Sequence, residues 1–377
     1  MTALNPDIDP DGLLEFSVVF TDRSLNHMSA AFQGVMRDIS GMLREVYSAD
    51  AVALVPGGGT YAMEAVARQF ATGANVMVLR NGWFSYRWSQ IFAAGDIPET
   101  ETVLMARRTG NDAEAPFAPA PIEQVEAAIA ETAPDVVFAP HVETSAGIIL
   151  PDDYIARVAK AVHDVGGLFV LDCIASGCVW VDMRALGVDV VISAPQKGWS
   201  AAPSAGLVML SEAALARAKA RQSTSFAVDL GKWLAIMEAY ENGGHAYHAT
   251  MPTDALRGFR DAMLEAKAHG FDALKAAQID QGAKVRALLE GRGFRSVAGD
   301  GFKAPGVVVS YTDDPAVKTG KVFAEAGVQI AAGVPLEVGE GADFSTFRIG
   351  LFGIDKLKDV DASVARLDAA FDRVFAA

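Results

Sequence analysis

Short apolar runs alternate with amphipathic stretches along the first two thirds of the chain. The apolar runs are rich in β-branched residues and have the length of buried strands; they span 51–55, 76–79, 135–139, 168–172, 188–193 and 205–210. The stretches between them, such as 60–72, 122–132 and 152–165, repeat apolar residues with the period of a helix. This alternation predicts an α/β fold in which helices cover both faces of a largely parallel sheet.

The pattern changes after Pro252. A long helical region is predicted over 254–290, followed by strand-like pieces at 306–311 and 346–351 and helices over 315–326 and 355–375. A chain of 377 residues is long enough for two hydrophobic cores. We therefore expect a large α/β domain over 15–253 and a smaller C-terminal α+β domain over 254–377.

Composition narrows the class of protein. The formal net charge of −15 argues against a nucleic-acid or anionic-membrane partner, because such surfaces need clustered Lys and Arg. No apolar run approaches membrane-spanning length, and the acidic, proline-broken first eleven residues resemble no secretory signal or transit peptide. Cys173 and Cys178 lack the partners of a zinc site and read as buried thiols. We expect a soluble cytoplasmic protein without a metal.

Two polar residues stand where neighbouring apolar runs end. Asp172 closes the run 168–172, and Lys197 follows the run 188–193. At the carboxyl ends of parallel strands, both would face one crevice. Pyridoxal phosphate (PLP) chemistry uses this pair, a lysine that holds the aldehyde as a Schiff base and a carboxylate that keeps the pyridine nitrogen protonated. A surface lysine with an unrelated aspartate is the alternative.

Two further features point to anion binding. The segment Pro-Gly-Gly-Gly-Thr (56–60) ends the first apolar run and opens the first helix, where backbone N–H groups can receive a phosphate. It has neither the Lys of a P-loop nor the spacing of a dinucleotide fingerprint, so a turn without a ligand is an equal alternative. Arg348 lies within an otherwise apolar strand and could bind a substrate carboxylate or form a structural salt bridge.

Together these residues resemble the class V aminotransferases of the aspartate-aminotransferase-like superfamily, most closely the alanine–glyoxylate (serine–pyruvate) branch. The resemblance extends from about Asn26 to Ile354. It rests on motifs in family order: Pro-Gly-Gly-Gly-Thr-Tyr-Ala-Met-Glu (56–64), Asn-Gly-Trp-Phe (81–84), His-Val-Glu-Thr-Ser-Ala-Gly (141–147), Gln-Lys (196–197) and Tyr-His-Ala-Thr-Met-Pro (247–252). It implies PLP fold type I, with a large mostly parallel-sheet domain and a smaller α+β domain.

The resemblance also implies a role for each matching residue. The phosphate contacts would be Gly58, Gly59 and Thr60. The remaining cofactor contacts would be Phe84 stacked on the ring, Thr144, Asp172 at the ring nitrogen, Gln196 and the Schiff-base lysine Lys197. Arg348 would bind the substrate carboxylate. Tyr247 and Thr250 would complete the phosphate cup of the neighbouring subunit, which implies a homodimer with shared active sites.

The reaction implied is ping-pong transamination from a small amino acid, alanine-like or serine-like, to a small 2-keto acid such as glyoxylate or pyruvate. Lys197, as a near-neutral amine, would move the α-proton. The aromatic residues Trp83, Tyr86 and Trp88 around Phe84 favour small substrates.

Three alternatives stay open beside this interpretation. Met28 stands where phosphoserine aminotransferases carry a phosphate-binding arginine, which makes that activity less expected, and neither cysteine lies where cysteine desulfurases need one. A PLP-dependent lyase or hydrolase of the same fold is a further possibility. So is a non-catalytic PLP-fold binding module. The Pro-Gly-Pro segment usual in this branch is replaced by Phe16 to Asp22, so this part of the substrate pocket is not predicted.

Overall fold

The computed structural model describes residues 6–375, and the first five residues of the N-terminal segment and the last two of the chain lie outside that range. Its centre is a seven-stranded sheet in the order β1-β11-β10-β9-β6-β2-β3. The strands are β1 (Ala51–Pro56), β2 (Asn75–Arg80), β3 (Thr100–Met105), β6 (Val136–Pro140), β9 (Leu168–Asp172), β10 (Val190–Ser193) and β11 (Ala205–Leu210).

The sheet is parallel apart from one strand. The neighbours β10, β9, β6, β2 and β3 pair in parallel, whereas β11 is antiparallel to both β10 and β1. Six of the seven strands match the apolar runs of the sequence, and β3, whose side chains are partly exposed, lacks such a run. The predicted class, α/β with a mostly parallel sheet, is confirmed.

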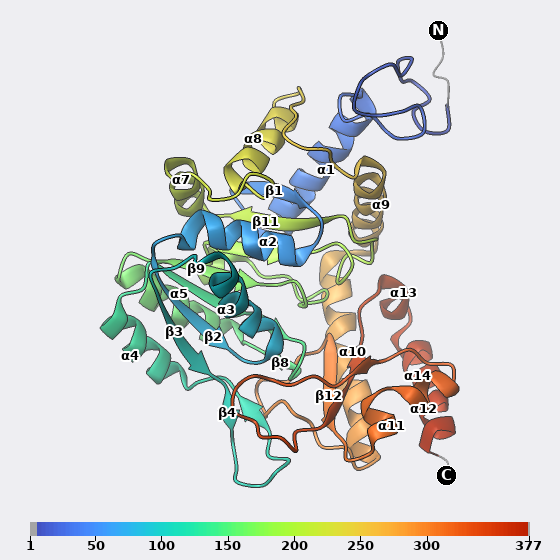
Figure 1. The fold of residues 1–377 in the computed structure, drawn as a ribbon. Helices are drawn as coiled ribbons and strands as arrows, with labels where there is room; N and C mark the ends of the chain where they lie inside the picture. Colours follow the sequence, from blue (N-terminus) through green and yellow to red (C-terminus); the bar gives the residue numbers. More distant parts are fainter. Residues whose placement is uncertain (1–5, 376–377) are drawn as a thin grey trace.

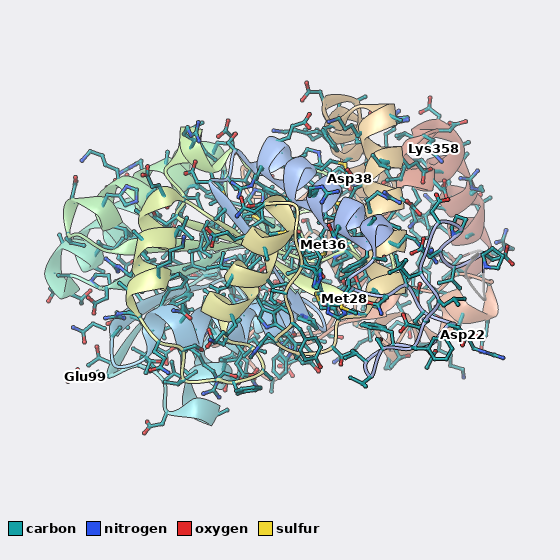
Figure 2. All side chains as sticks on the ribbon, turned by 90° about the horizontal axis from the view of Figure 1, so that it is seen from above. Asp22, Met28, Met36, Asp38, Glu99 and Lys358 are labelled. Atoms are coloured by element: carbon teal, nitrogen blue, oxygen red, sulfur yellow. The ribbon has the colours of Figure 1, made fainter. Side chains whose placement is uncertain are left out.

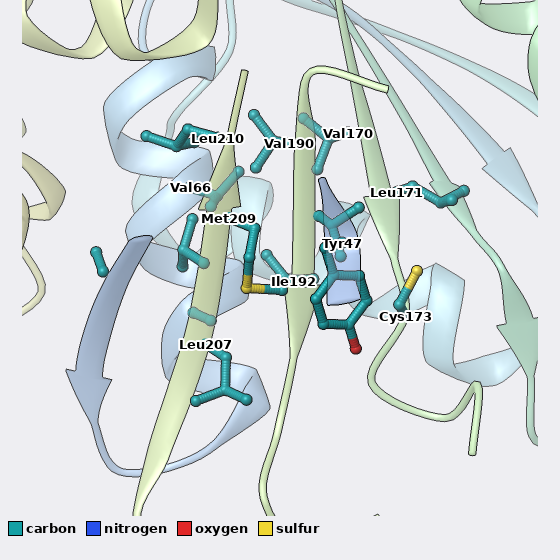
Figure 3. Packing of buried hydrophobic residues seen from close by; sticks show 14 of the residues in the cluster. Tyr47, Val66, Val170, Leu171, Cys173, Val190, Ile192, Leu207, Met209 and Leu210 are labelled. Carbon is teal, nitrogen blue, oxygen red and sulfur yellow. The ribbon is translucent and has the colours of Figure 1, made fainter. Parts of the chain in front are cut away.

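Helices cover both faces of this sheet (Figure 1). They are α1 (Ala30–Tyr47), α2 (Gly59–Val66), α3 (Trp83–Gly95), α4 (Ile122–Thr132), α5 (Asp152–Asp164), α6 (Met183–Leu186), α7 (Glu212–Ala220), α8 (Leu230–Glu241) and α9 (Thr253–His269). A π-helical turn, η1 (Ala67–Ala71), continues α2. Figure 3 shows the core beside β10 and β11, where Tyr47 of α1 packs near Ile192 and Cys173.

The C-terminal part has a smaller antiparallel sheet in the order β12-β14-β13. Its strands are β12 (Val307–Tyr311), β13 (Ala331–Ala332) and β14 (Thr346–Gly350), and α10 (Phe271–Gly291), α11 (Pro315–Lys318), α12 (Lys321–Glu325), α13 (Ile354–Leu357) and α14 (Val360–Phe375) surround it. Two short strand pairs lie among the strands of the large sheet in chain order: β4 (Arg107–Arg108) with β5 (Phe117–Ala118) between β3 and β6, and β7 (Val142–Glu143) with β8 (Ile148–Ile149) between β6 and β9.

Two of the predicted long helices are interrupted by glycine. The region 254–290 is two helices, α9 and α10, because Gly270 adopts φ 100° at their junction. The region 315–326 is likewise divided into α11 and α12 at Gly320, whose φ is 77°. The domain boundary after residue 253 remains a prediction, and α9, which follows it, packs against α1 (Figure 1).

Charged side chains are visible at the surface. Figure 2 shows charged side chains around the periphery, among them Asp22, Glu99 and Lys358. Within residues 6–375, no helix combines the length and the apolar character needed to cross a membrane. Both cysteines are buried and unpaired, as their sequence setting predicts.

Candidate active site

Asp172 and Lys197 lie at the carboxyl edge of the large sheet, on neighbouring parallel strands. Asp172 is the last residue of β9 and pairs in register with Ile192 of β10. Lys197 follows the end of β10 by four residues (197 − 193). The Asp172 side chain is buried, and its Oδ1 accepts a hydrogen bond of 2.9 Å from the Ile174 amide. Ligands of open α/β sheets bind at this edge.

The two groups have perturbed acidities. Burial raises the pKa of Asp172 to about 7; the Ile174 amide and the charges of Arg87 and Lys197 oppose this shift. Burial also lowers the pKa of Lys197, and the charge of Arg348 lowers it further, while Asp172 acts in the other direction. A lysine with a lowered pKa is closer to the neutral amine that can act as a nucleophile or base.

Arg348 reaches the same place from the small sheet. It lies in the middle of β14, and its Nε donates a hydrogen bond of 2.8 Å to the Ala332 carbonyl. Its guanidinium lies 5.7 Å from the centre of the Phe84 ring on α3. No carboxylate of residues 6–375 forms an ion pair with it. The alternative of a structural salt bridge is therefore wrong, and the guanidinium fork is free for an anionic ligand.

The N-terminus of α2 adjoins Asp172. Gly58 precedes the helix without any side chain to cap it, and the first turn contains no acidic residue. A Cβ on Gly59 would lie 2.4 Å from Cδ1 of Ile174, so this helix end is packed against the chain just after Asp172. A Cβ on Gly58 would meet nothing within 4 Å. A helix end without a capping side chain has the chemistry to receive an anion.

Phe84 is positioned by a buried carboxylate. Glu143 accepts hydrogen bonds from the amides of Phe84 and Ser85, at 3.2 and 2.9 Å, and from the Ser85 hydroxyl at 2.7 Å. It also accepts from the amide and the hydroxyl of Ser145, at 3.0 and 2.7 Å. Glu143 thereby caps α3 and fixes the direction in which Phe84 leaves the helix. Thr144, which follows it, is buried at the same point.

The remaining predicted residues are divided between two locations. Gln196 adjoins Lys197, and its Oε1 is buried without a hydrogen-bond partner among the described residues. Tyr247 and Thr250 lie on the loop between α8 and α9, where their hydroxyls are 3.2 Å apart. The Tyr247 side chain is 53% exposed, and no hydrogen bond within residues 6–375 joins either residue to Asp172, Lys197 or Arg348.

Sequence reasoning missed three residues around this group. Phe352 places its ring centre 5.1 Å from Lys197 Nζ. Glu143 was noted only as part of the motif 141–147, without a role of its own. Its hydrogen bonds connect it to residues 58 and 59 positions earlier in the chain. Arg87 follows Phe84 by three residues. This closeness to the motif 81–84 is the one feature of the sequence that could have indicated that Arg87 belongs to the site. It contacts both Phe84 and Thr60.

One expectation about the pocket is wrong. Trp88 is fully buried, with its ring 4.5 Å from that of Phe138 and 6.2 Å from that of Phe92. Positions 88 and 92 are one helical turn apart and face β6, so Trp88 belongs to the core between α3 and the sheet. Of the three aromatic residues expected to limit substrate size, only Trp83 and Tyr86 are partly exposed.

The fold and the site define an α/β enzyme with a lysine, a carboxyl group and an uncapped helix N-terminus at the carboxyl edge of the large sheet, together with an arginine from the small sheet that has no ion-pair partner among residues 6–375. Residues 16–362 match the family model described as "Aminotransferase class-V". The chain belongs to the class V aminotransferase family. It is an aminotransferase, an enzyme that transfers an amino group to a keto acid.

Related proteins support this membership. The chain is 27% identical over 356 residues to a 2-aminoethylphosphonate–pyruvate transaminase of Paraburkholderia phymatum, covering 91% of this chain and 90% of the relative. A protein of the same name from Syntrophobacter fumaroxidans is 25% identical over 331 residues, covering 85% and 84%.

Solved structures show the same fold. An alanine–glyoxylate aminotransferase from Nostoc sp. superposes with a TM-score of 0.78 at 22% identity, covering 93% of this chain and 88% of the other. A subgroup IV aspartate aminotransferase from Thermus thermophilus gives a TM-score of 0.75 at 25% identity, with 93% and 92% covered. The predicted aspartate-aminotransferase-like fold is confirmed.

Proposed function

We propose that this aminotransferase uses PLP to move the amino group of a small amino acid to a small 2-keto acid. The observation that carries the proposal is the position of Lys197, four residues beyond β10 and beside the strand that ends at Asp172, within range of the charges of both Asp172 and Arg348. Pyruvate as the acceptor is supported by the relatives whose names contain it. Glyoxylate is included as a possible acceptor because one of the solved structures with the same fold is an alanine–glyoxylate aminotransferase.

The residues present fit PLP at both of its ends. The uncapped start of α2 offers amide groups to a phosphate, and Gly58 leaves space there for it. Asp172 is a buried carboxyl group whose pKa is raised by burial, and no cation forms an ion pair with it among residues 6–375; a protonated ring nitrogen would be such a partner. When bound, PLP supplies an aldehyde that can capture the amino group and a ring that withdraws electrons from the α-carbon.

Each residue then has a distinct task. Arg348 binds the substrate carboxylate and orients the α-carbon. Lys197 holds the cofactor at rest and, as the free amine, takes the α-proton on Nζ. Asp172 holds the proton of the ring nitrogen. Phe84 would pack against the ring and exclude water, while Thr144 and Gln196 would help to hold the cofactor from positions beside Glu143 and Lys197.

We further propose that the enzyme works as a cytoplasmic homodimer. The hydroxyls of Tyr247 and Thr250 lie together on a loop, both residues are exposed, and within residues 6–375 the two hydroxyls form a hydrogen bond only with each other. In a second copy they would complete the phosphate cup formed by Gly58, Gly59 and Thr60. Fully active monomers in sedimentation experiments would refute this arrangement.

Absorbance of the PLP-loaded protein tests the proposed function. Each amino acid is added alone, and we expect a small donor such as alanine or serine to bleach the visible band stoichiometrically. A 2-keto acid such as pyruvate or glyoxylate should then restore the band, as a ping-pong transaminase requires. 2-Aminoethylphosphonate belongs in the panel because of the relatives' names. A band that recovers without a keto acid would instead indicate a lyase.

Variants make the test specific. We expect Lys197→Ala to lower kcat by about 10³-fold or more, since a positioned base alone contributes about 10²–10⁴-fold. Lys232→Ala changes an exposed lysine on α8 and should leave kcat unchanged. Wild-type turnover by Lys197→Ala would contradict the proposal. Protein that stays colourless with added PLP would instead favour a non-catalytic binding module.

A further inference from the structure

Arg87 has an unusual position for a cation. It projects from α3 so that its Nη1 donates a hydrogen bond of 3.2 Å to Oγ1 of Thr60, the second residue of α2. The N-terminus of a helix carries a partial positive charge, so a guanidinium placed there is unfavourable unless an anion lies between them. No side chain caps this helix, and its first turn holds no acidic residue.

No protein carboxylate neutralises Arg87 either. Among residues 6–375 it forms no ion pair, and its other close contact is the Phe84 ring, 5.2 Å from the guanidinium carbon. Its charge does reach the site, because it acts on the buried carboxyl of Asp172. Arg68, in the π-helical turn η1 that continues α2, is by contrast paired with Glu64 of α2 at 2.8 Å. The position of Arg87 thus combines a free cation, a free helix end and a polar contact between them.

The hydroxyl of Thr60 connects these elements. Because its oxygen accepts the bond from Arg87, its proton is left to donate to another acceptor, and a hydroxyl polarised in this way is a stronger donor. Gly58, two residues earlier, has no side chain that could serve instead. The contact therefore directs a hydroxyl donor and a guanidinium toward one position at the head of α2.

We propose that Arg87, acting with Thr60, is part of the site that binds the cofactor phosphate. The inference rests on the proposed use of PLP and adds to it a residue from α3. The guanidinium supplies the positive charge that a dianionic phosphate needs and that the backbone amides give only in part. Phe84 and Arg87 are one turn apart on α3, so the same helix would bind the ring and the phosphate of one cofactor.

Comparing PLP with pyridoxal tests the inference directly, because the two ligands differ only in the phosphate. Apo protein is titrated with each, and binding is followed by absorbance and tryptophan fluorescence. We expect Arg87→Gln to weaken PLP about ten- to hundredfold, the effect of losing a charge-assisted hydrogen bond, while pyridoxal affinity changes less than about twofold. Arg87→Lys should recover part of the affinity, since it restores the charge without the fork.

Two further variants provide the controls. Thr60→Val should weaken PLP less than Arg87→Gln does, and the double variant should lose less than the product of the two single effects, because the residues act together. Arg366→Gln removes an exposed arginine on α14 and should leave both ligands unaffected. Inorganic phosphate should raise the melting temperature of wild-type apo protein but not that of Arg87→Gln.

The outcomes separate this inference from the proposed function. Equal weakening of PLP and pyridoxal by Arg87→Gln would overturn the inference, because Arg87 would then act on the ring or on the fold. Unchanged PLP affinity with a raised KM for the amino donor would overturn it as well, by assigning Arg87 to the substrate. In both cases PLP binding by the wild type would stand. Wild-type protein that binds neither ligand would overturn the proposed function and the inference together.

Discussion

Glu143 and Asp172 are both buried carboxyl groups near the carboxyl edge of one sheet, yet their surroundings differ. Glu143 accepts five hydrogen bonds from two backbone amides of α3, from the Ser145 amide and from two serine hydroxyls. Asp172 accepts one hydrogen bond, from the Ile174 amide. Glu143 is provided with partners by the fold itself, whereas Asp172 is left to find its partner in a ligand.

The difference shows how a carboxyl group available for catalysis can be distinguished from one that stabilises the fold within the same site. A buried carboxylate with all of its partners stabilises the fold and is held fixed, because each partner loses a hydrogen bond if it leaves. One with few partners costs free energy when it is charged, and its pKa rises accordingly, here to about 7 for Asp172. Both residues are buried, so their exposure does not distinguish them, whereas the number of their hydrogen-bond partners does.

The largest expected effect that separates the two is on catalysis. Asp172→Asn should lower kcat by about 10³-fold, because an amide cannot hold the ring nitrogen protonated and the electrostatic contribution to the reaction is lost. The protein should remain folded by circular dichroism. Steady-state formation of the keto product from the amino donor measures the change. Asp189→Asn, a buried carboxyl bound to His163 at the other edge of the sheet, should leave kcat within a few-fold. Similar losses in both variants would break the distinction.

The next effect is on stability. Glu143→Ala should lower the free energy of unfolding by about 3–5 kcal/mol, since it leaves several buried donors without an acceptor. Urea denaturation of the apo protein measures this loss. Glu131→Ala, at an exposed position on α4, should change stability by less than about 0.5 kcal/mol. If Glu143→Ala were as stable as this control, its hydrogen bonds would not be what anchors α3.

The third effect, which vanishes at the acidic end of its range, is a pH dependence of stability that only Asp172 should show. Its pKa rises on folding from an ordinary value near 4 to about 7, so the folded apo protein holds a proton that the unfolded chain releases. Stability due to this group is therefore lost as the pH rises from about 4 to about 7. Asp172→Asn removes the loss, and its advantage in unfolding free energy over the wild type should grow across that window, by up to about 4 kcal/mol. Urea titrations at several pH values check it; an advantage independent of pH would contradict the assignment.

Much of this site was predictable because its parts follow local rules. Asp172 ends one apolar run of strand length and Lys197 follows another, and parallel strands bring such ends to one edge of a sheet. The Gly-rich segment could be placed at a helix start because glycine there follows a strand. Arg348 was conspicuous because a cation within an apolar strand requires an explanation.

The rest depends on contacts that the sequence does not encode locally. Nothing near Arg87 indicates that its guanidinium meets Thr60, which lies 27 positions earlier. Trp88 was assigned to the pocket because it neighbours Phe84 in sequence, whereas the helical period turns its ring toward Phe138. The breaks at Gly270 and Gly320 were missed because a single glycine can also be tolerated within a helix.

The position of Arg348 on β14 also has a consequence for synthesis. The residues proposed to hold the cofactor in this chain end at Lys197, and Arg348 is made 151 residues later (348 − 197). At about 5–20 residues per second, roughly 8–30 s separate the two on the ribosome. A growing chain thus contains every residue that it contributes to its own proposed cofactor site well before it contains the arginine proposed to recognise the substrate.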